Sequence, residues 1–206
     1  MAKRPSNIGL NDTPALPHPG LLALQGLVEK GKVKPGQSIL INGAGGGVGT
    51  LGIQILKSFV GLTVTGVNSY EKTELMKSLG YDSVIDYKKM DFTDIGEKFD
   101  LIIDTKSYCS AFKVIRSLKK NGRYITVGGS IYRSFEIAEL GPQLSLFTGK
   151  KLSVLIHEPH KGLDQISKLV KKGQLHPVID GPYEFEKIPE LIQYFGEGRR
   201  MGKNSR

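Results

Sequence analysis

Short apolar runs alternate along the chain with longer stretches in which apolar residues recur at helical spacing. The short runs are rich in β-branched residues and lack strict apolar–polar alternation, which is typical of strands covered on both faces. The strands we expect are Ser38–Asn42, Leu62–Val67, Ser83–Tyr87, Leu101–Asp104, Arg123–Val127 and Leu152–Ile156. The helices we expect are Pro19–Lys30, Val48–Ser58, Glu71–Ser78, Ala111–Lys119, Leu163–Lys172 and Glu190–Phe195.

This alternation predicts an α/β fold: a doubly wound, parallel sheet of six strands with helices on both faces. Gly80, Gly122 and Gly173 each follow an expected helix, where glycine commonly ends one. After Leu175 the chain reads as an extended, proline-broken segment, and its last residues, GRRMGKNSR, have no strand pattern.

Glycine is concentrated between the first expected strand and the helix after it, in the stretch Gly43–Gly49. A strand, a glycine-rich turn and a helix, in that order, open the dinucleotide-binding Rossmann fold. Aligned on the helix start, the fingerprint is A-x-G-x-x-G at Ala44, Gly46 and Gly49. The helix N-terminus offers N–H groups and a positive dipole end to phosphates. A turn without a ligand is the alternative, and the flanking strand and helix disfavour it.

The end of the second expected strand carries no acid. An NAD site usually has Asp or Glu there, holding the ribose 2′-hydroxyl. In this chain Asn68 and Ser69 occupy the place, and Glu71 and Lys72 follow. A neutral strand end tolerates a 2′-phosphate, and Lys72 could pair with it, so the pattern favours NADP(H) over NAD(H). Taken alone, Lys72 reads better as an ordinary exposed helix lysine.

The composition of the 206-residue chain is ordinary for a soluble globular protein, with 39% apolar and 24% charged residues. The net charge is +9, but the lysines are spread along the whole chain. We therefore expect a lysine-rich surface and no nucleic-acid partner. No apolar run is long enough for a bilayer, and the N-terminus has no apolar signal core. These features predict a cytoplasmic protein without a membrane partner.

Cysteine and histidine are few. Cys109 is the only cysteine, and the histidines are His18, His157, His160 and His176. They show no zinc-ligand spacing, so we expect no dedicated metal site. His157 and His160 read as solvated loop residues. A nucleophilic Cys109 would need a lowered pKa.

Several ordered motifs resemble the medium-chain dehydrogenase/reductase superfamily, and most closely its zinc-independent, NADP-dependent quinone oxidoreductase-like branch. These motifs are LPHPGLLALQGL, KVKPGQSILINGAGGGVGTLGIQI, MKSLGYDSVIDY, FDLIIDT and GRYITVGG. The stretch from KKLSVLIHEPH to YFGEG resembles the C-terminal part of the same group. The match runs roughly from Ala15 to Gly202.

The resemblance implies an NADPH-dependent reductase of quinones, enones or other activated alkenes. It implies that the glycine stretch cradles the pyrophosphate, that residues after the second and third strands surround the 2′-phosphate, and that the ends of the fourth and fifth strands line the nicotinamide. Together with Asn68, the expected cofactor residues are Ala44, Gly45, Gly46, Gly47, Val48 and Gly49; Ser69, Lys72 and Tyr87; and Thr105, Val127, Gly128 and Gly129.

The chain also departs from the family pattern. The family carries a large N-terminal substrate domain, whereas here residues 1–14 read as a non-family extension. Residues 15–175 then form the NADP(H)-binding domain and 176–206 a remnant of the substrate domain's C-terminal segment. The family's G-L-T-A is Gly20–Ala23, its D-x-V-G is Asp104–Ser107, and its G-K-V-V-I stops at Gly202–Asn204.

Three functions remain open. The first is an oxidoreductase by lineage, whose substrate half is lost, shed or supplied by a partner chain, and which could be weak or inactive without it. The apolar surface that the missing half would leave exposed favours a homo-oligomer. The second is a non-catalytic module that binds NADPH or senses redox state. The third, a short-chain reductase, needs Tyr-x-x-x-Lys, but Tyr108 is followed by Phe112 and Tyr132 by Glu136. Lys106, Tyr108 and Tyr132 read better as solvated loop residues than as catalytic groups, so no catalytic residue is named.

Overall fold

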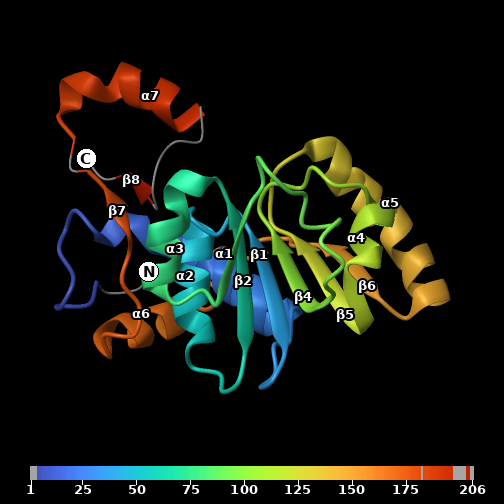
Figure 1. The fold of residues 1–206 in the computed structure, drawn as a ribbon. Helices are drawn as coiled ribbons and strands as arrows, with labels where there is room; N and C mark the ends of the chain where they lie inside the picture. The colour runs from blue at the N-terminus through green and yellow to red at the C-terminus, as the bar shows by residue number, and fades with distance from the viewer. Residues whose placement is uncertain (1–3, 182, 197–202, 205–206) are drawn as a thin grey trace.

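A six-stranded parallel sheet forms the centre of the structure, a computed structural model that describes residues 4–181, 183–196 and 203–204 (Figure 1). The strand order is β3-β2-β1-β4-β5-β6. The strands are β1 (Ser38–Asn42), β2 (Thr63–Asn68), β3 (Ser83–Asp86), β4 (Phe99–Asp104), β5 (Leu118–Thr126) and β6 (Lys151–Val154). The predicted doubly wound parallel sheet is thereby confirmed.

Helices connect the strands and cover both faces of the sheet. The α-helices are α1 (Pro17–Leu24), α2 (Gly47–Leu56), α3 (Thr73–Leu79), α4 (Ala111–Arg116), α5 (Ile131–Thr148), α6 (Leu163–Lys171) and α7 (Ile188–Gly196). Shorter or wider turns are η1 (Thr13–Ala15), η2 (Gln25–Lys30), η3 (Tyr70–Lys72) and η4 (Phe185–Lys187). A second, two-stranded sheet pairs β7 (Ile179–Asp180) with β8 (Lys203–Asn204).

Strand β1 shows that both faces of the sheet are covered by apolar cores. Successive side chains of a strand point to opposite faces. Ile39 and Ile41 enter one core, built from α1, α2, α3 and α6, while Leu40 enters a second core beneath α4 and α5. All three side chains are almost wholly buried. The apolar run of β1 therefore reflects burial on both sides.

The strand order reverses at β1. Strand β1 pairs with β2 on one side and with β4 on the other, and Asn42 lies opposite Val67 and Asp104. In an open parallel sheet, the carboxyl ends of the strands at such a reversal diverge and leave a crevice in which ligands bind. The end of β1, where the glycine stretch begins, is at this point.

The longest helix was not predicted from the sequence. Helix α5 contains Pro142, which deprives one turn of its hydrogen bond and obscures the helical pattern. Its ends do carry ordinary signals: the Ser130 side chain accepts from the Arg133 N–H, and Gly149 ends the helix in the left-handed conformation. Gly141 lets α5 approach β6, since a β-carbon there would lie 2.7 Å from the Leu152 carbonyl oxygen.

Some boundaries differ from the expected ones. The helix expected at Ala111–Lys119 ends at Arg116, and β5 starts at Leu118, so Gly122 lies inside a strand and does not end a helix. Gly80 ends α3 in the left-handed conformation, as predicted. The helix expected at Pro19–Lys30 is α1 followed by the wider turns of η2. The GRRMGKNSR segment contains β8, although no strand was expected there.

The segment before α1 packs against the main domain, whereas the segment after α6 leaves it. Ile8 joins the larger core, and the Asn7 side-chain amide donates to the Val170 carbonyl of α6 at 2.7 Å. After α6 the chain leaves the main sheet, and α7 stands apart from it at the upper left of Figure 1. Among the described residues, none of the helices combines the length and apolarity needed to cross a bilayer.

Candidate functional site

The turn between β1 and α2 excludes β-carbons at two positions. Gly43 has φ +92, and a β-carbon on it would lie 2.0 Å from Thr105 Oγ1. A β-carbon on Gly49 would lie 2.3–2.6 Å from the backbone of Ala44. These distances are far below van der Waals contact. Gly43 is therefore required by its left-handed backbone and the close Thr105 side chain, and Gly49 by the close backbone of Ala44.

Hydrogen bonds lock this turn onto the sheet. The N–H groups of Gly43 and Ala44 both donate to the Val67 carbonyl of β2, at 3.0 and 3.1 Å. The buried Tyr81 hydroxyl donates to the Gly49 carbonyl in the first turn of α2 at 2.9 Å. The start of α2 is thus fixed against the ends of β1 and β2.

The first turn of α2 presents free backbone donors. Its N-cap is Gly46, which has extended backbone and no side chain to accept from the helix. Within the described part of the chain, the N–H groups of Gly47, Val48 and Gly49 have no hydrogen-bond acceptor. Such a helix end attracts anions through its N–H groups and its dipole. The geometry suits a phosphate group.

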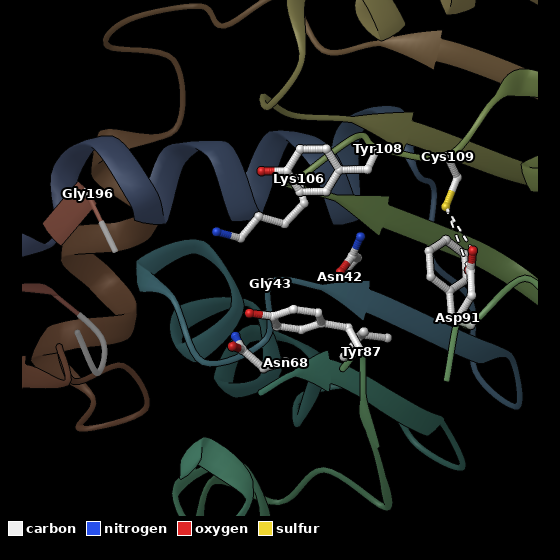
Figure 2. A pocket seen from close by; sticks show the side chains of 11 residues that line it. Asn42, Gly43, Asn68, Tyr87, Asp91, Lys106, Tyr108, Cys109 and Gly196 are labelled. Atoms are coloured by element: carbon white, nitrogen blue, oxygen red, sulfur yellow. Dashed lines mark hydrogen bonds between the residues drawn. The ribbon is translucent and has the colours of Figure 1, made fainter. Parts of the chain in front are cut away.

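A cavity of about 410 Å³ opens beside this turn, at the carboxyl ends of β1, β2, β3 and β4 (Figure 2). Its volume is within the usual range for small-molecule sites. The described residues that line it are Asn42, Gly43, Val67, Asn68, Tyr87, Asp91, Phe92, Lys106, Tyr108, Cys109 and Gly196. The cavity occupies the crevice that the reversal of strand order creates.

Of the expected 2′-phosphate residues, Asn68 and Tyr87 line the cavity. The Asn68 side-chain oxygen accepts from the Ser69 N–H at 2.9 Å, and both residues are buried. Tyr87 directly follows β3 and is about half exposed, at 56%. These residues and the glycine turn come together at the same edge of the sheet.

Lys72 differs from the exposed helix lysine described above. It ends η3 and is only 5% exposed. Its side chain runs beneath the glycine turn, because a β-carbon on Gly45 would lie 2.7 Å from Lys72 Cδ. The absence of a side chain on Gly45 leaves the space that Lys72 fills.

The acid after β2 is already paired. Glu71 lies in η3 rather than in α3, and its carboxylate is 3.0 Å from Lys88 Nζ. A hydrogen bond from the Ser69 side chain, and then those from its own backbone and Lys88, lower the pKa of Glu71 to about 2. Glu71 is therefore ionised at neutral pH, and Lys88 partly offsets its charge.

The loop after β4 is organised by a buried carboxylate. Asp104 accepts from the Lys106 and Ser107 N–H groups, each at 2.8 Å, and from the Asn42 side chain at 2.9 Å. The Tyr124 hydroxyl donates to its other oxygen at 2.9 Å. Burial raises the pKa of Asp104, while these donors oppose the rise. The network fixes the course of the loop at the edge of the cavity.

The expected nicotinamide residues lie where β4 and β5 end, and they are not part of the cavity lining. The Thr105 hydroxyl donates to the Asn42 carbonyl at 2.9 Å, and the Val127 N–H donates to the Asp104 carbonyl at 2.8 Å. The Gly128 carbonyl accepts from the Ser107 hydroxyl at 2.6 Å. Gly129 has φ +99 and packs directly on the Lys106 carbonyl. These contacts join the two loops into one surface.

Several cavity residues were absent from the sequence-derived set. Asp91 and Phe92 come from the long connection between β3 and β4, and Lys106, Tyr108 and Cys109 from the loop after β4. A parallel sheet brings loops after neighbouring strands together, and Asp104 directly precedes the second group. The position of Lys106, Tyr108 and Cys109 just after a predicted strand was therefore the sequence signal that could have placed them at the site.

The Cys109 thiol lies beside an acid. Its sulfur is 3.7 Å from Asp91 Oδ1, and Asp91 is also 3.4 Å from Lys113 Nζ. Burial, and then the charges of Asp91 and Asp104, raise the pKa of Cys109 to about 12. The thiolate form that a nucleophile requires is therefore disfavoured.

The histidines do not all match the expectation of solvated loops. His160 is exposed, but His157 is partly buried and packs edge-on against His18, with ring centroids 5.1 Å apart. His157 Nδ1 is buried and has no hydrogen-bond partner among the described residues.

The family model named "Zinc-binding dehydrogenase" matches residues 79–204, more than half of the chain. The chain belongs to the zinc-binding dehydrogenase family. The resemblance to medium-chain dehydrogenases/reductases is thereby confirmed. Across the described ranges, no three His, Cys, Asp or Glu side chains gather in a way that could hold a metal ion. The side chains of the described residues therefore do not fit a zinc centre.

Relatives support the same assignment over nearly the whole chain. A 2-methylene-furan-3-one reductase of Solanum lycopersicum is 32% identical over 98% of this chain and 48% of its own length. The NADPH-dependent alkenal/one oxidoreductase of Arabidopsis thaliana is 28% identical over the same shares. A quinone oxidoreductase structure from Coxiella burnetii has a TM-score of 0.84 at 25% identity and covers 99% of this chain and 62% of its own. The chain spans about half the length of the curated relatives it matches.

These relatives, together with the family, support a nicotinamide dinucleotide as the cofactor of this family member. The residues present fit such a group: a glycine cradle that a β-carbon would fill, three free N–H groups, and a cavity at the strand-order reversal.

Gly49→Ala should lower the free energy of unfolding by about 3 kcal/mol, because its β-carbon would collide with the Ala44 backbone and force α2 away from the turn. Urea denaturation followed by circular dichroism measures the change. Gly196→Ala is the matched control, since no atom lies within 4 Å of its β-carbon position. We expect that variant to change by less than about 1 kcal/mol. Equal changes in the two variants would contradict the packing argument.

Alkylation of Cys109 by iodoacetamide at pH 8 should be more than tenfold slower in the native protein than in urea, because its raised pKa leaves little thiolate. Intact mass gives the rate, since the chain has no other cysteine. The native rate should keep rising beyond pH 9, whereas the unfolded chain should level off near its ordinary pKa of about 8.5. Asp91→Asn should speed the native reaction. A native rate that levels off near pH 8.5 would refute this reading of the thiol.

Proposed function

We propose that this chain binds NADP(H) and serves as the cofactor-binding part of an oxidoreductase that reduces quinones or activated alkenes. The observation that carries the proposal is the uncapped first turn of α2, held over the end of β1 beside the cavity. Its three N–H groups point out of the helix without an acceptor among the described residues. A diphosphate is the group that this arrangement fits best.

The residues from Ala44 to Gly49 would hold the diphosphate through their backbone. Tyr81 would keep the donors of α2 aligned by its hydrogen bond to the Gly49 carbonyl. The adenosine half would lie in the cavity, against Asn68 and Tyr87. The cavity volume of about 410 Å³ suits one half of an extended dinucleotide better than the whole.

The preference for NADP(H) over NAD(H) rests on charge at the end of β2. Asn68 is neutral, so it would not repel a 2′-phosphate, and Ser69 adds a hydroxyl there. The nearby acid, Glu71, is paired with Lys88. Lys72, although buried, lies next to Asn68 beneath Gly45 and adds positive potential. The Arabidopsis relative is named an NADPH-dependent oxidoreductase, which agrees with this preference.

The nicotinamide would extend toward the ends of β4 and β5, where Thr105 and Val127–Gly129 form a continuous surface. When bound, NADPH would supply a hydride. The part of this chain in that step would be to hold the ring at near-attack distance from a quinone or alkene. Quinones and alkenal/one compounds are proposed as substrates because relatives carry those names.

The chain would then consist of two parts. Residues 15–175 would be the NADP(H)-binding domain, because the main sheet and its covering helices end with α6. Residues 176–206 would belong to a substrate domain, because β7 and β8 pair with each other and not with the main sheet. The proposed location is the cytoplasm, without a nucleic-acid or membrane partner.

A non-catalytic NADPH-binding module is the second candidate. It is favoured by the exposure of Ile131, Tyr132 and Phe135, which follow the proposed nicotinamide surface and are 70–75% exposed. An open nicotinamide face admits water and holds a substrate poorly. Such a chain would bind the cofactor and transfer hydride slowly or not at all.

Asn68→Asp should lower NADPH affinity at least tenfold while leaving NADH affinity equal or improved, because a carboxylate there repels a 2′-phosphate and can hold a 2′-hydroxyl. The substitution keeps the hydrogen bond to the Ser69 N–H. Fluorescence titration of NADPH and NADH measures both affinities. Asn121→Asp adds the same charge between the two ends of β5, away from the cavity, and should change neither affinity. NADH binding better than NADPH in the unaltered chain would contradict the NADP(H) assignment.

The two candidate functions separate in one further assay: a quinone, then an enone, is added to the NADPH complex, and NADPH absorbance is followed. Turnover supports the enzyme, and tight binding without oxidation supports the module. If neither dinucleotide binds, the proposed function is wrong.

A further inference from the structure

A single lysine reaches the cavity. Among the described residues that line it, Lys106 is the only one with a positively charged side chain. In Figure 2 its side chain extends across the space above Gly43, between the rings of Tyr108 and Tyr87. Its ammonium group therefore lies on the cavity side of the loop after β4.

The backbone of Lys106 is held from two directions. Its N–H donates to the buried Asp104 carboxylate at 2.8 Å. On the other side, Gly129 packs so closely that a β-carbon there would lie 1.9 Å from the Lys106 carbonyl oxygen. The loop therefore cannot rotate freely, and the direction of the side chain follows from a buried scaffold.

The charge of Lys106 is not neutralised by a nearby acid. In the part of the chain that the structure describes, no carboxylate lies within 4 Å of its ammonium group. The acid of the cavity lining, Asp91, is instead bound to the Thr93 N–H at 2.9 Å and paired with Lys113 at 3.4 Å. An unpaired cation beside free helix donors favours an anionic ligand.

We propose that Lys106 binds the diphosphate bridge of the cofactor, together with the first turn of α2. This inference deepens the proposed function and rests on it. The loop reads Asp104-Thr105-Lys106-Ser107 where the related pattern is D-x-V-G, so the lysine is a feature of this chain. Lys72 is buried and is not among the described residues that line the cavity, whereas Lys106 is.

Sheet order selects the diphosphate over the 2′-phosphate. Strand β4, which carries Lys106, is adjacent to β1, and β1 lies between β4 and β2. Lys106 is therefore one strand away from the turn at Gly43 but two strands away from Asn68, where a 2′-phosphate would lie. Neighbouring strands are about 4.8 Å apart. The distance from Lys106 to the diphosphate position is therefore the shorter of the two.

The test compares Lys106→Met and Lys106→Arg with the unaltered chain by titration with NADPH, NADH, ADP-ribose and inorganic pyrophosphate. Lys106→Met should weaken all four by about tenfold, since a charged hydrogen bond is lost. It should also leave the NADPH-to-NADH ratio unchanged. Its affinity should vary less steeply with salt, because one charge no longer contributes. Lys106→Arg should retain most of the affinity.

Lys120→Met is the matched control, because this substitution removes the same charge. Lys120 is exposed and lies near the opposite, amino end of the sheet. It should alter binding less than twofold. Circular dichroism checks that each variant is folded. A loss confined to NADPH would assign Lys106 to the 2′-phosphate and overturn the inference. Unchanged affinities in Lys106→Met would also overturn the inference, but they would leave the proposed function intact. If the unaltered chain binds neither dinucleotide nor pyrophosphate, both proposals fail. Lysine-dependent binding of pyrophosphate without any dinucleotide binding would refute the proposed function and, with it, the assignment of Lys106 to the diphosphate bridge of the cofactor.

Discussion

The contact of Gly49 with the backbone of Ala44 is the constraint on which the site depends. It sets how closely α2 approaches the end of β1, and the Tyr81 hydroxyl holds the helix there through the Gly49 carbonyl. At that distance the first turn of α2, whose N–H groups have no acceptor among the described residues, begins beside the cavity that Gly43 lines. The anion-binding character of the turn is therefore a result of packing more than of any side chain.

Most of the fold could be predicted because its strands are continuous apolar runs and its helices have regular spacing. The strand Ser38–Asn42 was correct at both ends. Helix α5 could not be recognised by spacing, because Pro142 interrupts it and few of its side chains are buried. The start of β5 was missed because Lys119–Asn121, which follow the first residue of the strand, are polar and exposed. Polar or interrupted elements are specified by tertiary packing, which a local pattern does not contain.

The site could be predicted only where its signal is local. The glycine stretch and Asn68 are recognised from order along the chain. The remaining cavity residues meet because β4 lies beside β1, a long-range pairing with no local signature. Lys72 and Lys106 illustrate the limit: both are lysines near a strand end, yet one fills the space under Gly45 and the other extends into the cavity. Only the surrounding backbone decides between these two directions.

The loop after β4 owes its shape to the buried Asp104 carboxylate and to main-chain groups. Asp104 accepts from successive backbone N–H groups, and Gly129 braces the carbonyl of the same segment. Among the described residues, the side chains of Lys106 and Tyr108 make none of these stabilising contacts. Evolution can therefore exchange them while the architecture stays fixed, and ligand preference can drift by single substitutions without a folding penalty. A fixed loop backbone that carries exchangeable side chains therefore lets this part of the site change its ligand preference without a change of fold.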